Sequence, residues 1–351
     1  MRRWTLAATV LAVAMTAVAV WQITEAPGSI TEESQPSRST ASIPGLPVLV
    51  TIDPGDSPQA IGERLEKLGV IPSAAHFRIL VSLLGYEQLL QAGQYEFERG
   101  TPTLEAVLRI REGRTSTRRV VLREGLRREE VAEILAQEDV VSAAEFLAAA
   151  QRSYPYDFLA DLPPGASLEG YLFPATYDFR HNMSGQEVVE AMLRAFGQNV
   201  TPGLRQEARE AGLTLHQVVT LASIVEREAQ LAQERPIMAQ VFLKRLRLGI
   251  PLEADPTVQY ALAQDPDSVR RYGYWKQELT EADLAIDSPY NTYLNGDLPP
   301  GPIANPGLDA ILAIIRPADT DYLYFVAKPD GSHAFAKTEE EHLKNVETYQ
   351  R

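Results

Sequence analysis

Two stretches of the chain repeat the same pattern of apolar and polar residues. The first starts at Val50 (VTIDPGDSPQAIGERLEKLGVIPSAAHF) and the second at Val120 (VVLREGLRREEVAEILAQEDVVSAAEF). In each stretch, alternating residues typical of a strand lead into a glycine, Gly55 or Gly125. Apolar residues three or four positions apart, typical of a helix, then follow. The pattern predicts a duplicated αβ unit, with a further strand at 94–97 and a helix at 103–110 between the copies.

Beyond about residue 161 the pattern changes to helices separated by Pro- and Gly-rich loops. Ser184 followed by Glu187 three residues later predicts the start of a helix that runs to about Phe196. Thr214 and Gln217 form a second such pair, which predicts a helix over residues 215–230.

One acidic residue interrupts the apolar face of the helix over 215–230. At about 100° per residue, Glu226 lies about 60° from the centre of this face, and Glu228 lies about 100° away. A carboxyl group that is buried without a nearby cation has a raised pKa, as a general acid at neutral pH requires. Glu226 is therefore a candidate acid, with a solvated or salt-bridged residue as the alternative. The apolar positions of the face are Leu215, Val218, Val219, Leu221, Ala222, Val225 and Ala229.

The loops downstream of this helix are rich in Tyr, Asn and Thr. They lie at 255–257, 288–293, 298–307 and 322–335. Rigid loops that display aromatic faces with amide and hydroxyl groups suit a polar ring such as a sugar. The alternative is that these loops only close the fold.

The chain begins with a segment of bilayer length. Residues 4–23 contain no charge, follow Arg2 and Arg3, and have a Trp near each end, which predicts a single span with a cytoplasmic N-terminus. The small residues 17–19 also fit a signal-peptide cleavage site, the alternative to an anchor. Residues 24–47, rich in Ser, Thr, Pro and Glu, are expected to be a disordered linker.

Composition narrows the possible chemistry. The 351 residues include 33 Lys plus Arg, 47 Asp plus Glu and no Cys, for a formal charge of −14. No thiol, disulfide or Cys-bound metal is possible, and an acidic chain without a basic patch is not expected to bind nucleic acid. We expect an α+β protein with four parts: an anchor at 1–23, a linker at 24–47, the αβ repeat region at 48–160 and a mainly helical catalytic domain at 161–351.

Five motifs in order resemble those of the endolytic murein transglycosylase family, also called the YceG-like family. They are LEGYLFPATY (168–177), LASIVEREA (221–229), FLKRLRLGIPLEADPTVQYAL (242–262), SPYNTYLNGDLPPGPIANPG (288–307) and YLYFV (322–326). The resemblance implies a single-span protein of the bacterial inner membrane with a LysM-like αβ region and a catalytic domain outside the cytoplasm. It further implies that the enzyme cuts nascent peptidoglycan strands internally. Peptidoglycan synthases and division proteins are candidate partners.

The resemblance places the catalytic acid at Glu226, within the motif ASI-[IV]-E-x-E. It implies cleavage of the β-1,4 bond between N-acetylmuramic acid and N-acetylglucosamine without water, which leaves a 1,6-anhydro end. One glutamate, acting first as acid and then as base, would suffice without metal or cofactor. Further candidates for holding the sugar or orienting Glu226 are Glu169, Asp255, Tyr290, Asn291, Asn305 and His333.

Two other classes of function remain open at the level of sequence. A lysozyme-type hydrolase would need a second carboxylate about 5–9 Å from Glu226, with Glu169 or Asp255 as nominees. A non-catalytic scaffold would bind peptidoglycan through the αβ copies and recruit other enzymes, with Glu226 as a paired structural acid.

Overall fold

The first αβ copy has its own small core. The protein is described by a computed structural model that covers residues 47–113, 115–180 and 183–350. Strand β1 (Val48–Ile52) pairs antiparallel with β2 (Gly93–Phe97), and alternate residues of both strands enter the core. Helices α2 (Pro58–Lys67) and α3 (Ala74–Leu83) follow β1, and α4 (Thr103–Arg111) follows β2. The strand and helix expected between the copies are confirmed.

The second copy repeats the same order of elements. Strand β3 (Thr117–Val121) leads through a turn into α5 (Arg128–Gln137) and α6 (Ala143–Ala150). The turn glycine has a positive φ in both copies, +89° at Gly55 and +77° at Gly125, a conformation that favours glycine. The predicted duplication is therefore confirmed.

The second copy shares its core with the C-terminal region. Strand β3 pairs antiparallel with β4 (Thr176–Arg180), with Val120 opposite Tyr177. One continuous apolar cluster contains Val120 at one end of the sequence and Ile315 at the other. The boundary expected between residues 160 and 161 therefore lies inside a single core.

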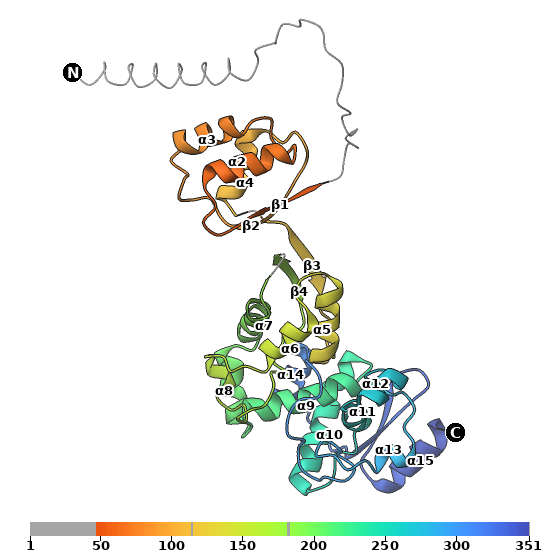
Figure 1. Ribbon diagram of the computed structural model, residues 1–351. Helices are drawn as coiled ribbons and strands as arrows, with labels where there is room; N and C mark the ends of the chain where they lie inside the picture. Colours follow the sequence, from red (N-terminus) through yellow and green to blue (C-terminus); the bar gives the residue numbers. More distant parts are fainter. Residues whose placement is uncertain (1–46, 114, 181–182, 351) are drawn as a thin grey trace, which may run out of the picture. The chain divides into compact units, whose positions relative to one another are not determined.

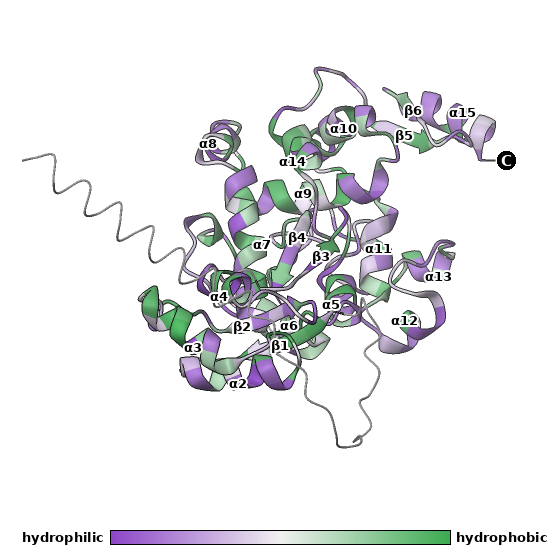
Figure 2. Ribbon diagram, turned by 90° about the horizontal axis from the view of Figure 1, so that it is seen from above, coloured by the Kyte–Doolittle hydropathy of each residue, from purple (hydrophilic) through white to green (hydrophobic). Residues whose placement is uncertain are grey.

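Helix α9 (Leu215–Glu228) lies at the centre of this core (Figure 1). It contacts α8 (Pro202–Glu210), α10 (Arg235–Leu248), α11 (Asp255–Leu262) and α14 (Leu308–Ile315). Apart from Asp309 in its first turn, helix α14 consists of apolar residues (Figure 2). All seven apolar positions of the predicted face of α9 are buried, and so are residues outside that face: Thr220, Ser223 and Ile224. Every residue of α9 is therefore buried or half-buried, and none is exposed.

Both predicted capping boxes are present. Ser184 and Glu187 start α7 (Gly185–Asn199), and Thr214 and Gln217 start α9. Helix α7 ends three residues later than expected, and α9 ends at Glu228, two residues earlier than expected.

The C-terminal segment 322–335, expected to be a loop, contains a hairpin. Strand β5 (Tyr324–Ala327) pairs antiparallel with β6 (His333–Ala336), and α15 (Glu339–Tyr349) packs on both strands. The Pro and Gly residues that suggested a loop lie in the turn between the strands. The remaining short elements are α12 (Pro266–Tyr272), α13 (Glu281–Leu284), η1 (Asp157–Leu159) and η2 (Ala232–Glu234).

The expected α+β class is confirmed for the part of the chain that the structure describes, where helices predominate over three two-stranded sheets. No helix of those residues is long and apolar enough to cross a membrane. The anchor expected at 1–23 and nearly all of the linker expected at 24–47 lie outside the described residues. The LysM-like character of the αβ copies stays a prediction.

Candidate active site

A cavity of about 390 Å³ opens where the C-terminal end of α9 meets the hairpin and α15. Its size falls within the range of about 300–1,000 Å³ that is usual for small-ligand sites. Acidic, aromatic and imidazole side chains line it, among them Glu228, Asp255, Tyr293, Tyr324, Phe325 and His333. The cavity combines titratable groups with the aromatic faces that a sugar ring requires.

Glu228 is the acidic residue of α9 that lines this cavity. It is the last residue of the helix, where the helix dipole disfavours a negative charge. Burial and the nearby Asp255 carboxylate raise the pKa of Glu228 to about 8, against the opposing effects of the Asp255 backbone and Arg227. Glu228 therefore carries a proton at neutral pH and is able to donate it.

Asp255 lies beside Glu228 at the first turn of α11. The Tyr293 hydroxyl donates a hydrogen bond of 2.6 Å to Asp255 Oδ1. The loop carrying Tyr293 is fixed to the start of α11, because Thr292 Oγ1 accepts a 3.0 Å hydrogen bond from the Ala254 N–H and lies 2.9 Å from Thr257 Oγ1. The motifs at 255–257 and 288–293 are thus joined into one wall of the site.

His333 enters the cavity from β6 and is held by a buried carboxylate. Its Nδ1 lies 2.7 Å from Glu234 Oε2, and its backbone N–H donates to Glu234 Oε1 at 3.0 Å. Both residues are less than 9% exposed. Asp255 and His333 are therefore the two predicted site residues that share the cavity with Glu228.

Glu226 has a different environment from the one expected. Its side chain is only 5% exposed, but Arg235 Nη2 donates to its Oε1 at 2.6 Å. The Gly307 N–H donates to its Oε2 at 3.0 Å, and Glu226 is not among the residues that line the cavity. The expectation that Glu226 lacks a nearby cation is wrong, because α10 begins with an arginine that faces it.

Glu169 and Asn305 belong to a buried polar network and not to the cavity. Asn305 Nδ2 donates to Glu169 Oε1 at 3.0 Å and to the Leu126 carbonyl at 2.9 Å, while its Oδ1 accepts from the N–H groups of Gly170 and Leu172. One amide thereby ties together three segments that are distant in sequence.

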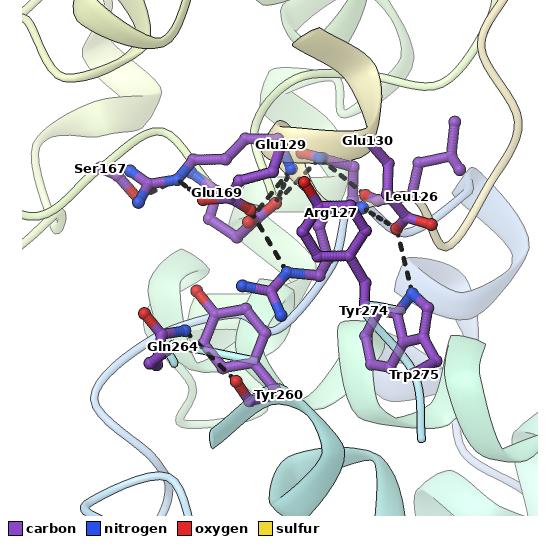
Figure 3. Close-up of polar contacts among 12 residues, drawn as sticks. Leu126, Arg127, Glu129, Glu130, Ser167, Glu169, Tyr260, Gln264, Tyr274 and Trp275 are labelled. Carbon is purple, nitrogen blue, oxygen red and sulfur yellow. Dashed lines mark hydrogen bonds and ion pairs between the residues drawn. The ribbon is translucent and has the colours of Figure 1, made fainter. Parts of the chain in front are cut away.

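Glu169 also accepts the Arg128 N–H, the first free amide of α5, at 3.1 and 3.2 Å from its two carboxylate oxygens. Burial and Glu129 raise the pKa of Glu169 to about 8, with Arg127 opposing. Figure 3 shows Arg127 among Glu129 and the rings of Tyr260, Tyr274 and Trp275. Neither Glu169 nor Asn305 is among the residues that line the cavity, and their expected contact with the substrate stays a prediction.

Asn291 and Tyr290 also serve the loop architecture. Asn291 is fully buried, donates to the carbonyls of Leu284 and Ile286 at 2.9 Å, and accepts the Tyr293 N–H at 2.9 Å. The Tyr290 ring packs 4.7 Å from the Tyr260 ring, away from the residues that line the cavity.

Sequence reasoning passed over Glu228 because it assumed that α9 has a solvent face. The angle between a residue and the apolar face shows which of Glu226 and Glu228 is buried only if the opposite side of the helix is exposed to solvent. A usable signal did exist, because a Glu at the end of a helix is disfavoured by the dipole and is therefore unusual. No pattern in the sequence pointed to Glu234 or Arg235, because the residues they contact, His333 and Glu226, do not lie beside them in the chain.

The fold and the cavity define an α+β protein with a pocket lined by acidic, aromatic and imidazole side chains. A model of the YceG-like family matches residues 50–348. The endolytic murein transglycosylase of Bacillus subtilis (strain 168) is 34% identical over 316 residues, which cover 86% of this chain and 84% of that protein.

Two further relatives agree with this match. The endolytic murein transglycosylase of Streptococcus pneumoniae serotype 2 (strain D39) is 31% identical over 325 residues, which cover 85% of this chain and 58% of that protein. The crystal structure of a YceG-like protein of Listeria monocytogenes is similar with a TM-score of 0.57 and 32% identity, covering 85% of this chain and 99% of that one. The chain belongs to the YceG-like family.

Proposed function

We propose that this protein is an endolytic lytic transglycosylase of peptidoglycan in which Glu228 is the general acid. The observation that carries the proposal is a cavity lined by a buried carboxyl group at the end of α9, Glu228, whose pKa is raised to about 8. The family and the names of the relatives support the reaction class.

The reaction cleaves the β-1,4 bond between N-acetylmuramic acid and N-acetylglucosamine in two proton transfers. The glycosidic oxygen leaves C1 of the muramic residue and takes the proton of Glu228. The C6 hydroxyl oxygen then bonds to C1 and loses its proton to a base, which leaves a 1,6-anhydro end. No water enters the product.

The geometry supports Glu228 better than Glu226 as the acid. Glu226 already accepts hydrogen bonds from Arg235 on one carboxylate oxygen and from the Gly307 N–H on the other, and it does not line the cavity. Its contacts fit a residue that fixes the 298–307 loop to α9. The sequence-based assignment of the acid to Glu226 nevertheless remains a hypothesis that the same experiment tests.

A matched pair of substitutions tests the assignment. We expect Glu228→Gln to lower the rate of anhydro-end formation by about 10²–10⁴-fold, the usual range for a general acid. We expect Glu226→Gln to retain more than a tenth of the wild-type rate, once corrected for any loss of folded protein seen by circular dichroism. The opposite ranking would return the acid role to Glu226.

A lysozyme-type hydrolase is the second candidate function, because Asp255 is close enough to Glu228 to raise its pKa. In that case Asp255 would be the second carboxylate. Mass spectrometry of digested strands separates the possibilities. Anhydro ends support the transglycosylase, reducing ends would indicate the hydrolase, and uncut strands would indicate a scaffold.

We also propose that residues 4–23 anchor the protein in the cell membrane, with the catalytic domain outside the cytoplasm. The support is an uncharged segment of bilayer length between two Trp residues. The mature protein should sediment with membranes and retain this segment. A soluble form that begins near Val20 would show that the segment is a signal peptide.

A further inference from the structure

The carboxylate of Glu234 fixes the proton of the His333 ring. Glu234 uses Oε1 to accept the His333 backbone N–H, so only Oε2 remains for Nδ1, which lies 2.7 Å away. A carboxylate oxygen cannot donate a proton here unless it is itself protonated, so the ring carries its proton on Nδ1. In the neutral ring Nε2 is then an acceptor, the arrangement that a carboxylate imposes on a catalytic imidazole.

The His333 ring lies at the cavity wall, and its Nε2 has no hydrogen-bond partner there among the residues that the structure describes. The Phe325 ring stands edge-on to the imidazole at 5.6 Å and restricts its rotation.

The acid and the imidazole reach the cavity from different elements. Glu228 comes from the end of α9, whereas His333 comes from β6 of the hairpin. The other titratable or charged groups on the wall are Arg245, Glu253, Asp255, Tyr293, Tyr324 and His342. Of these, Arg245 is engaged with Glu253 at 2.9 Å, and Asp255 with the Tyr293 hydroxyl at 2.6 Å.

We propose that His333 is the base of the ring-closing step, an inference that rests on the proposed transglycosylase activity. Glu228 gives its proton to the departing glycosidic oxygen as the bond from C1 to that oxygen breaks. The C6 oxygen then forms its bond to C1, and the C6 hydroxyl proton moves to Nε2 of His333. After the product leaves, the imidazolium loses this proton and Glu228 regains one from solvent, so no net proton is consumed.

Because Glu228 and His333 act in different steps, bond cleavage and ring closure can be tested separately by choosing the substrate. An aryl glycoside of the disaccharide, with nitrophenolate as the group that leaves C1 of the muramic residue, needs no acid for bond cleavage. Ring closure still requires a base. An enzyme whose glutamate does both transfers and an enzyme with a separate imidazole base therefore respond differently to loss of Glu228.

The test uses Glu228→Gln and His333→Asn on both substrates. Asn can still donate to Glu234 from the position of Nδ1 but has no atom in the place of Nε2. On murein strands, we expect both variants to lose about 10²–10⁴-fold in kcat. On the aryl glycoside, Glu228→Gln should come within about tenfold of wild type, whereas His333→Asn should keep its loss.

Glu234→Gln provides a second variant in case His333→Asn does not fold. The Gln carbonyl would accept the His333 backbone N–H, and its amide would then face Nδ1 as a donor. This would force the ring proton onto Nε2, so the variant should lose activity on both substrates while its melting temperature stays close to that of wild type.

Two results would overturn the role of His333: near-normal rates for His333→Asn on murein, or a Glu228→Gln variant that stays inactive on the aryl glycoside. Either result with anhydro ends from the wild type leaves the proposed function intact. Reducing ends from the wild type would instead overturn the proposed function itself.

Discussion

The raised pKa of Glu228 predicts how the activity depends on pH. Only the protonated acid can start the reaction, so kcat/KM should fall as pH rises through about 8. We expect this basic limb in the pH–rate profile of the free enzyme on glycan strands. A profile that stays flat up to pH 10 would contradict the assignment of the acid to Glu228.

The same pKa predicts a cost in stability. Below about pH 4.5 the Glu228 carboxyl is protonated in both the folded and the unfolded chain, so it makes no difference. Between about 4.5 and 8 only the folded chain keeps the proton, so this residue lowers the free energy of unfolding as pH rises.

Glu228→Gln should therefore be more stable than wild type at pH 8.5, by more than about 1 kcal/mol. The advantage should vanish near pH 4. Chemical denaturation of the two proteins at both pH values measures it, and an equal difference at the two values would argue against a buried protonated acid.

The Asn305 side chain makes four hydrogen bonds inside the core. Asn305→Ala would leave the Gly170 and Leu172 N–H groups without their partner inside the core. We expect a loss of about 3 kcal/mol or more in the free energy of unfolding. The control is Asn295→Ala in an exposed loop, which should cost less than about 1 kcal/mol.

Close packing against the 168–177 segment fixes the position of helix α9. Gly170 has a φ of +87°, and a Cβ there would lie 2.5 Å from Pro302 and 2.7 Å from Val219. Gly165 has a similar φ of +79° with open space around it. The two glycines thus share the backbone requirement and differ in packing.

Gly165→Ala should cost about 1–2 kcal/mol from backbone strain alone. Gly170→Ala should cost at least about 2 kcal/mol more, because Val219 on α9 and the 298–307 loop must move. Thermal and chemical denaturation of the pair measures this difference. Equal losses would show that the packing of Gly170 against α9 is not a constraint.

The two αβ copies bury their apolar faces in different cores. The first copy completes its own core with β2, whereas the second pairs β3 with β4 and shares the core around α9. All residues that line the cavity lie between 228 and 350.

We expect a chain that starts at residue 48 to fold and remain active on soluble glycan. A chain that starts at residue 116 should also fold, because it keeps β3, α5 and α6. A chain that starts at residue 161 should not, since it removes the partner of β4 and exposes Phe179. Circular dichroism and product analysis of the three chains test this, and a folded third chain would restore the boundary at 160.

The sequence by itself determined the local features of the fold. The duplicated strand–turn–helix pattern, the turn glycines and the capping boxes at Ser184 and Thr214 depend on residues close together in the chain, and the structure has them as predicted. The motifs also sufficed for the family, because their residues and order are properties of the sequence alone.

Which residues line the cavity followed from the tertiary structure alone. Glu226 and Glu228 differ by two positions, and what separates them are partners distant in sequence: Gly307 holds the first, and Asp255 and the hairpin surround the second. Burial of α9 on all sides removed the solvent face on which the sequence-based choice depended. Charge, burial and pKa at a site depend on distances through space, which local periodicity does not contain.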